Sequence, residues 1–226
     1  MTVLTQLRQG LVASCQPVDD GPMDDPLITA AMALAAEAGG ANGLRIEGLD
    51  NLEATRPLTK LPIIGIVKRD LADSEVRITP FLEDVAGLAD LGADIIAYDA
   101  TQRPRPVPTA DIVAAIKAAG KLAMADAATL ADGEQALAEG ADILGTTLSG
   151  YAYDIAPAGA GPDYPLIRAY KDLGAFVMAE GRLNTPERAE EAMRQGADCV
   201  TVGSAITRVE HITGWFAAAV ARGADG

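Results

Sequence analysis

Eight short apolar runs, separated by Ala-rich stretches with helical spacing, constrain this chain more than any other feature of its sequence. Alternation of strand-length and helix-length segments predicts βα units and a parallel sheet. Eight such units close a sheet into a barrel, so we predict an α/β fold: a single (β/α)8 TIM barrel domain over residues 1–226. The runs begin at Leu11, Ala41, Pro62, Ala93, Lys121, Ala141, Phe176 and Cys199.

A recurring helix end supports the same prediction. Gly followed by Ala, and usually by Asp, stands before four of the runs, at residues 91–94, 139–142, 173–175 and 195–198. The glycine supplies a left-handed residue that ends a helix and turns the chain sharply into a strand. Helix starts are predicted at Thr185-Pro186, where an N-cap threonine precedes proline, and near Thr79-Pro80, which follows residues 74–77.

Composition excludes several classes of partner. A net charge of −14 over 226 residues argues against nucleic acid and anionic membranes, because both require a cationic face. The first ten residues lack the apolar core of a signal peptide, and no apolar run approaches the 18 residues of a membrane span. We therefore expect a cytoplasmic protein with a small-molecule partner, in which Cys15 and Cys199 are reduced thiols.

Polar residues that end the predicted strands are the candidates for chemistry, because this fold places its active site at the carboxyl ends of the strands. Lys68 is in phase with Ile64 and Ile66, and strand alternation likewise places Asp126 and Glu180 in phase with apolar residues. Lys68 follows five apolar residues, and burial lowers the pKa of a lysine towards that of a usable base. Glu180 as a partner of Arg182, and Asp126 as a helix cap, are the alternatives. The full set is Gln16, Arg45, Glu47, Lys68, Asp70, Asp99, Asp126, Ser149, Glu180, Arg182 and Ser204.

Two glycine turns after the last two strands indicate a phosphate site. Barrels of this kind bind phosphate with the loops after strands seven and eight and the N-terminus of a short extra helix. Gly181 follows the seventh run, Gly203 and Ser204 follow the eighth, and Arg208 adds a cation. The alternative is that Gly203-Ser204 is an ordinary turn.

Other features point to no further site. His211 is the sole histidine, so we predict no metal, although residue types alone leave open a magnesium site of Glu47, Asp99 and Asp126. No cofactor is predicted. Trp215 and Phe216 are interpreted as the packing face of the last helix, with a homodimer contact as the alternative. The irregular segment 153–163 is a lid candidate.

Long motifs give the chain a family resemblance that runs nearly end to end. It resembles the N-acetylmannosamine-6-phosphate 2-epimerases of bacterial sialic acid catabolism. The motifs are SCQP at 14–17, LRIEG at 44–48, PIIGIVKRD at 62–70, VRIT at 76–79, GADIIAYDAT at 92–101, RPRP at 103–106, ILGTTLSGY at 143–151, EGRLNTP at 180–186 and TVGSAITRVEHI at 201–212.

The resemblance implies an isomerase that inverts C2 of a phosphorylated amino sugar. It implies catalysis by Lys68 and Glu180. It assigns the sugar and its N-acetyl group to Gln16, Arg45 and Asp126, and the phosphate to Gly181, Gly203, Ser204 and Arg208. The chain departs from the family pattern in having Ala127-Ala128, where small polar residues are expected after Asp126. The competing hypotheses are another phosphosugar enzyme on the same fold and a catalytically silent sugar-phosphate sensor.

Overall fold

The computed structural model describes residues 2–153 and 161–224, and in them eight parallel strands close into one barrel. Strand order follows the sequence, and the barrel closes where Leu11 pairs with Val200. The predicted barrel and all eight predicted strand positions are confirmed. The strands are β1 (Leu11–Cys15), β2 (Gly43–Glu47), β3 (Ile63–Ile66), β4 (Ile95–Asp99), β5 (Leu122–Asp126), β6 (Ile143–Gly145), β7 (Phe176–Glu180) and β8 (Cys199–Val202).

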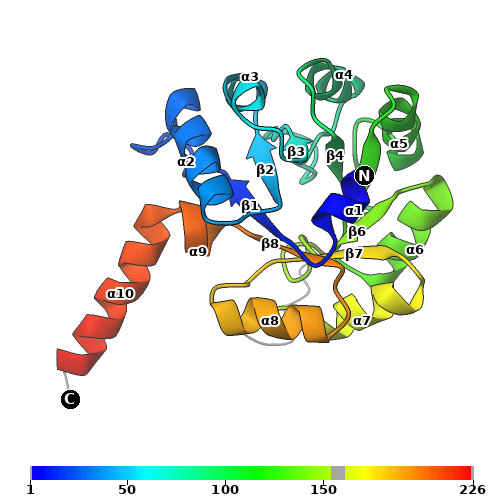
Figure 1. Cartoon of the computed structure of the whole chain (residues 1–226). Helices are drawn as coiled ribbons and strands as arrows, with labels where there is room; N and C mark the ends of the chain where they lie inside the picture. The colour runs from blue at the N-terminus through cyan, green and yellow to red at the C-terminus, as the bar shows by residue number, and fades with distance from the viewer. Residues whose placement is uncertain (1, 154–160, 225–226) are drawn as a thin grey trace.

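Helices cover the outside of the barrel (Figure 1). The short helix α1 closes its amino-terminal end, where Leu7 is fully buried against the interior. The helices are α1 (Val3–Leu7), α2 (Pro26–Ala38), α3 (Leu49–Thr55), the 3-10 turn η1 (Arg56–Leu58), α4 (Leu82–Asp90), α5 (Thr109–Ala118), α6 (Leu130–Glu139), α7 (Tyr164–Asp172), α8 (Pro186–Arg194), α9 (Ser204–Thr207) and α10 (Val209–Ala224). None of the described helices is both long and apolar enough to cross a membrane.

Alternation along the strands separates two apolar layers. One set of side chains fills the barrel interior, and among it are Ile64, Ile66, Met124, Phe176 and Met178. The opposite set, with Leu44, Ile46, Ile63 and Tyr98, packs under the helices. The phase predicted to carry Lys68, Asp126 and Glu180 is therefore the inward one. Residues that continue this phase past the last apolar layer point into the carboxyl-terminal mouth of the barrel.

The predicted Gly-Ala-Asp turns lie at the amino-terminal rim of the barrel, opposite the mouth. Gly92, Gly140 and Gly196 have φ of +86°, +101° and +105°, the left-handed conformation predicted for them. The aspartate two residues later then accepts a hydrogen bond from an amide of the first or second residue of the preceding strand: Asp94 from Ile63, Asp142 from Ala123 and Asp198 from Val177, each at 2.8–2.9 Å. Each aspartate also pairs with a cation, namely Arg56, Lys117 and Lys171 respectively.

One of the two predicted helix starts is correct. Thr185 caps α8, and its hydroxyl accepts from the Arg188 amide with Pro186 in the first turn. The start predicted near Thr79-Pro80 is wrong, because α4 begins only at Leu82. The Thr79 hydroxyl instead donates to the Ala97 carbonyl at 2.7 Å, so it ties the loop after β3 to β4.

The last helix departs from its predicted role. In Figure 1, α10 extends away from the barrel, and none of its residues is buried. Trp215 is 39% exposed and Phe216 is 71% exposed, so they do not form a packing face against this barrel. The chain leaves the barrel at Arg208, directly after α9, and the apolar side of α10 has no partner among the described residues.

Candidate active site

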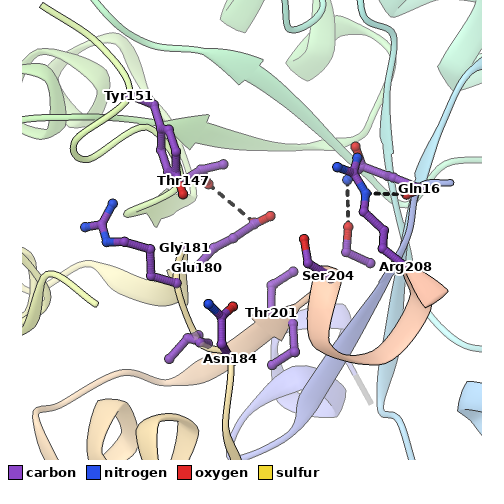
Figure 2. A pocket seen from close by; sticks show the side chains of 14 residues that line it. Gln16, Thr147, Tyr151, Glu180, Gly181, Asn184, Thr201, Ser204 and Arg208 are labelled. Atoms are coloured by element: carbon purple, nitrogen blue, oxygen red, sulfur yellow. Dashed lines mark hydrogen bonds between the residues drawn. The ribbon is translucent and has the colours of Figure 1, made fainter. Parts of the chain in front are cut away.

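A cavity of about 200 Å³ opens at the carboxyl ends of β1, β6, β7 and β8. The family resemblance assigns nine residues to catalysis or binding, and six of them line this cavity: Gln16, Glu180, Gly181, Gly203, Ser204 and Arg208. Figure 2 shows Glu180 and Gly181 on one side, Gln16 and Arg208 on the other, and Ser204 between them. The other three, Arg45, Asp126 and Lys68, do not line the cavity. Their positions relative to the cavity follow from their contacts.

Arg45 and Asp126 form a buried pair that holds Glu180. The Arg45 guanidinium donates two hydrogen bonds to Asp126, at 3.1 and 2.6 Å, and a third to Glu180 Oε2 at 3.0 Å. Arg45 is 1% exposed, Asp126 is fully buried and Glu180 is 14% exposed. Inward positions on β2, β5 and β7 therefore meet across the barrel and fix the orientation of the carboxylate in the cavity.

The charges of this cluster do not balance. Two carboxyl groups share one guanidinium, and a buried carboxylate without full compensation becomes easier to protonate. Burial raises the pKa of Glu180 to about 7; Arg45 opposes this effect and Asp126 adds to it. A carboxyl group with such a pKa exchanges protons readily near neutral pH, as a general acid or base requires.

Thr147 completes the cluster and is absent from the sequence-based set. Its hydroxyl donates to Asp126 Oδ1 at 2.6 Å and lies 3.3 Å from Glu180 Oε2 (Figure 2). A side chain at Gly145 would lie 3.0 Å from the Thr147 hydroxyl and 3.3 Å from Asp126 Oδ1. The glycine therefore leaves room for this contact. The sequence signal for Thr147 is the inward phase that it shares with Ile143 and Gly145, whereas the sequence-based set contains Ser149 from this run.

Lys68 lies two residues beyond β3, where its backbone pairs with Ile78. Its amide donates to Glu47 Oε1 at 3.1 Å. Burial lowers the pKa of the Lys68 amine; Glu47 opposes this shift, whereas Arg208 and Arg45 add to it. The Lys68 charge in turn lowers the pKa of Glu180, so the two groups lie within electrostatic range of each other.

The wall of the cavity also combines two glycines with a cation. Gly181 has φ of +103°, and Gly203 caps the short helix α9. A side chain at Gly203 would lie 3.3 Å from the Ser14 Cβ, so only glycine packs there without displacement. Arg208 Nε donates to the Gln16 carbonyl at 2.9 Å, which sets its side chain along this wall. Backbone amides at the first turn of a helix lack intrahelical acceptors and favour anions.

Arg182 serves the loop after β6 rather than Glu180. Its guanidinium donates to the carbonyls of Ser149 and Gly161, each at 2.6 Å. It also lies 5.5 Å from the ring centroid of Tyr151, a cation–π contact at the cavity edge. Arg182, two residues beyond β7, is thus bonded to Ser149 before the predicted lid segment and to Gly161 within it, whereas residues 154–160 of that segment lie outside the described part of the chain.

The remaining candidates lie away from the cavity. Asp70 is 83% exposed and pairs with Arg77, and Ser149 donates to Asp163. Asp99 is buried, but it is held within its own loop by Thr101 and Arg103. Within residues 2–153 and 161–224 no three His, Cys, Asp or Glu side chains are grouped as metal ligands.

The chain is similar to known proteins along most of its length. Residues 29–222 match the family described as "Putative N-acetylmannosamine-6-phosphate epimerase". A protein of Aliivibrio fischeri named "Putative N-acetylmannosamine-6-phosphate 2-epimerase" is 59% identical over 97% of this chain and 93% of its own length. A protein of the same name from Haemophilus influenzae is 60% identical over 96% of this chain and 95% of its own length.

A solved structure agrees with these relatives. That of the N-acetylmannosamine-6-phosphate 2-epimerase from Clostridium perfringens superposes with a TM-score of 0.92 at 40% identity, covering 96% of both chains. The thiamine phosphate pyrophosphorylase from Pyrococcus furiosus, with a TM-score of 0.62 and 19% identity, shares the fold alone. The family match covers most of the chain, and the relatives are about 60% identical over nearly all of it. The chain belongs to the N-acetylmannosamine-6-phosphate epimerase family.

Proposed function

We propose that this protein interconverts N-acetylmannosamine 6-phosphate and N-acetylglucosamine 6-phosphate, a step of amino sugar and sialic acid catabolism. One feature of the site carries the proposal within this family: the Glu180 carboxyl lines the cavity and is held by Arg45 at 3.0 Å and by Thr147 at 3.3 Å, and burial raises its pKa to about 7. Relatives at about 60% identity carry the name of this activity.

The reaction needs a group that removes a proton and a group that stabilises charge. In the open-chain sugar, the C2–H bond breaks and its electron pair is delocalised onto the aldehyde oxygen as an enolate. A proton then returns to the opposite face of C2. Lys68 and Glu180 are the proposed catalytic residues, because one has a lowered and the other a raised pKa, so both change protonation more readily than exposed groups.

Arg45, Asp126 and Gln16 are proposed to position the sugar and its N-acetyl group. Arg45 and Asp126 lie beneath Glu180, where they also fix its orientation. Gln16 lines the cavity, and its amide donates to the Ser14 hydroxyl at 2.6 Å. An oriented acid or base transfers protons more efficiently than a mobile one, since little reorganisation precedes the transfer.

The phosphate is proposed to bind at Gly181, Gly203, Ser204 and Arg208. All four residues line the cavity, and at Ser204 and Arg208 a helix N-terminus and a positive side chain converge. Crystals soaked with the phosphosugar test this assignment. Phosphate density at these residues supports it, and density at the amino-terminal end of the barrel refutes it.

Turnover tests the function directly. Pure protein mixed with N-acetylmannosamine 6-phosphate is followed by NMR through the acetyl proton signals, with chelator present in a parallel sample. We expect conversion to an equilibrium mixture with N-acetylglucosamine 6-phosphate at the same rate in both samples, because no metal or cofactor is proposed. Binding without conversion would identify a sensor, and loss of activity that a divalent cation restores would overturn the metal-free mechanism.

We also propose a cytoplasmic homodimer that binds neither membranes nor nucleic acid. The phosphorylated substrate is charged and crosses a bilayer poorly, and the net charge of −14 disfavours anionic partners. The contact proposed for the dimer is α10, whose Trp215 and Phe216 are exposed. Light scattering should give the mass of two chains, and Phe216→Glu should shift the mass towards one. A single-chain mass for the unaltered protein would contradict the dimer.

A further inference from the structure

We propose that Thr201 determines specificity in the reaction proposed above, by donating a hydrogen bond to the C3 or C4 hydroxyl of the sugar. The inference rests on the proposed function and adds to it a residue of β8 for the middle of the substrate. Thr201 is absent from the set of residues that the sequence singled out.

The first support is the place of Thr201 in the cavity wall. It lies on the inward phase of β8, between Cys199 in the barrel interior and Gly203 at the phosphate end. It is also the register partner of Glu180 on the neighbouring strand. Figure 2 shows its side chain at the cavity between Asn184 and Ser204.

The second support is an unused hydroxyl. Thr201 is 1% exposed, and its Oγ1 has no hydrogen-bond partner among the described residues. Leaving a buried donor unpaired costs stability, and native proteins therefore rarely do so. Such a group at a cavity wall is poised to gain a partner when a polar ligand enters.

Neighbouring threonines show that pairing is the rule at this end of the barrel. The Thr146 hydroxyl donates to the Glu180 carbonyl at 2.9 Å, the Thr147 hydroxyl to Asp126 at 2.6 Å and the Thr207 hydroxyl to the Ser14 carbonyl at 2.7 Å. Thr201 alone of these four lacks such a bond. The Thr201 hydroxyl therefore makes no hydrogen bond within the described fold, and it remains available to a ligand.

The position along β8 selects the part of the substrate. Glu180 is proposed to act at C2, and Gly203 and Ser204 are proposed to hold the phosphate on C6. Thr201 is level with Glu180 and two residues before Gly203, a rise of about 7 Å along a strand. In the open-chain sugar C3, C4 and C5 carry hydroxyls between these ends, and C5 is next to the phosphate-bearing C6. Because Thr201 is level with Glu180, the C3 and C4 hydroxyls are the nearer ones, so one of them is the acceptor.

The first test compares kinetics with stability. Thr201→Val removes the hydroxyl at nearly constant shape, and we expect kcat/KM to fall about tenfold through KM while the Tm stays or rises. Thr201→Ser should remain within about threefold of the unaltered protein. Thr29→Val and Thr55→Val are matched controls: both residues are buried with unpaired hydroxyls, but neither lines the cavity. A Thr201→Val protein with unchanged kinetics would overturn the proposal.

The second test names the contacted group. For the unaltered protein, either the 3-deoxy or the 4-deoxy analogue of N-acetylmannosamine 6-phosphate should lose about tenfold or more in kcat/KM. Thr201→Val should handle that analogue and the parent substrate almost equally. Discrimination that persists in full against both analogues contradicts the contact. If the unaltered protein does not turn over the parent substrate, the proposed function has failed, which is a separate outcome from failure at Thr201.

Discussion

The two ends of the barrel use acidic side chains in opposite ways. At the amino-terminal rim, Asp198 accepts from the Val177 amide and pairs with Lys171 at 2.9 Å and with Arg8. At the carboxyl-terminal mouth, Glu180 shares the single guanidinium of Arg45 with Asp126. Asp198 thus has two cations as partners, whereas Glu180 shares one cation with a second carboxyl group.

This difference separates stability from chemistry. A carboxylate that accepts from a backbone amide and pairs with two cations contributes to the free energy of folding. A carboxyl group that competes with another for one cation retains proton affinity, and its pKa rises to about 7. The proposed catalysis therefore depends on incomplete charge compensation at Glu180, and variants at both ends of the barrel test this.

The largest expected effect is at the mouth. Lys68→Ala and Glu180→Ala should each reduce epimerase activity at least about a hundredfold, the lower range for loss of a positioned acid or base. Both side chains lie beyond the apolar layers of the barrel, so the Tm should change little. Turnover by NMR and thermal unfolding measure the two quantities. A variant that keeps more than about a tenth of the activity would remove that residue from the mechanism.

The opposite pattern is expected at the rim. Asp198→Ala leaves the Val177 amide and Lys171 without their acceptor, which should cost about 2 kcal/mol of stability. For a chain of this size the Tm should then fall by about 4–8 °C. The kcat of the folded protein should stay within about twofold. A large loss of kcat at unchanged Tm would contradict the assignment of stability to the amino-terminal rim and of catalysis to the mouth.

The pH dependence of activity should follow the pKa of Glu180, which burial and the nearby Asp126 carboxyl group raise. In the unaltered protein, log(kcat/KM) should change slope near pH 7, where Glu180 goes from protonated to ionised. Asp126→Asn removes a negative charge and leaves Arg45 to Glu180, so the pKa of Glu180 and the change of slope should move to lower pH by about one unit. The profile is measured from pH 5 to 9. A shift to higher pH would contradict this electrostatic account.

The smallest expected effect concerns Thr147. Thr147→Val removes the hydroxyl that contacts both carboxyl groups, and kcat should fall about fivefold with KM nearly unchanged. Thr147→Ser keeps the hydroxyl and should restore kcat to within about twofold. If Ser and Val behave alike, the side chain fills space and does not orient Glu180.

Much of the fold could be predicted because its signals are periodic and local. Each strand is an apolar run, and each Gly-Ala-Asp turn reports a left-handed residue such as Gly140, with φ of +101°. Thr79-Pro80 misled because the same residues serve a loop, where the Thr79 hydroxyl binds a strand carbonyl 18 residues away. The direction taken by α10 after Arg208 also left no local signal, since its composition suits a packed helix equally well.

The sequence predicted several residues of the cavity wall but missed two of its hydroxyl groups. Gln16 and Glu180 stand out because a polar side chain at the end of an apolar run is unusual, Arg208 stands out because it follows the glycine turn after the eighth run, and all three line the cavity. Thr147, two residues beyond β6, and Thr201, in β8, do not stand out by residue type. Their importance depends on distances to side chains on other strands, which the sequence does not contain.

Hydrogen exchange at C2 during turnover tests the central claim most directly. In heavy water the unaltered protein should place deuterium at C2 of both sugar phosphates, because the enolate is reprotonated from a group that exchanges with solvent. Slow exchange of a shielded ammonium would delay this in a short run, so the reaction is followed through many turnovers. The proposed mechanism requires that the unaltered protein incorporate deuterium at C2 and that Lys68→Ala fail to do so. Retention of the original hydrogen through many turnovers, with Lys68→Ala still active, would contradict it.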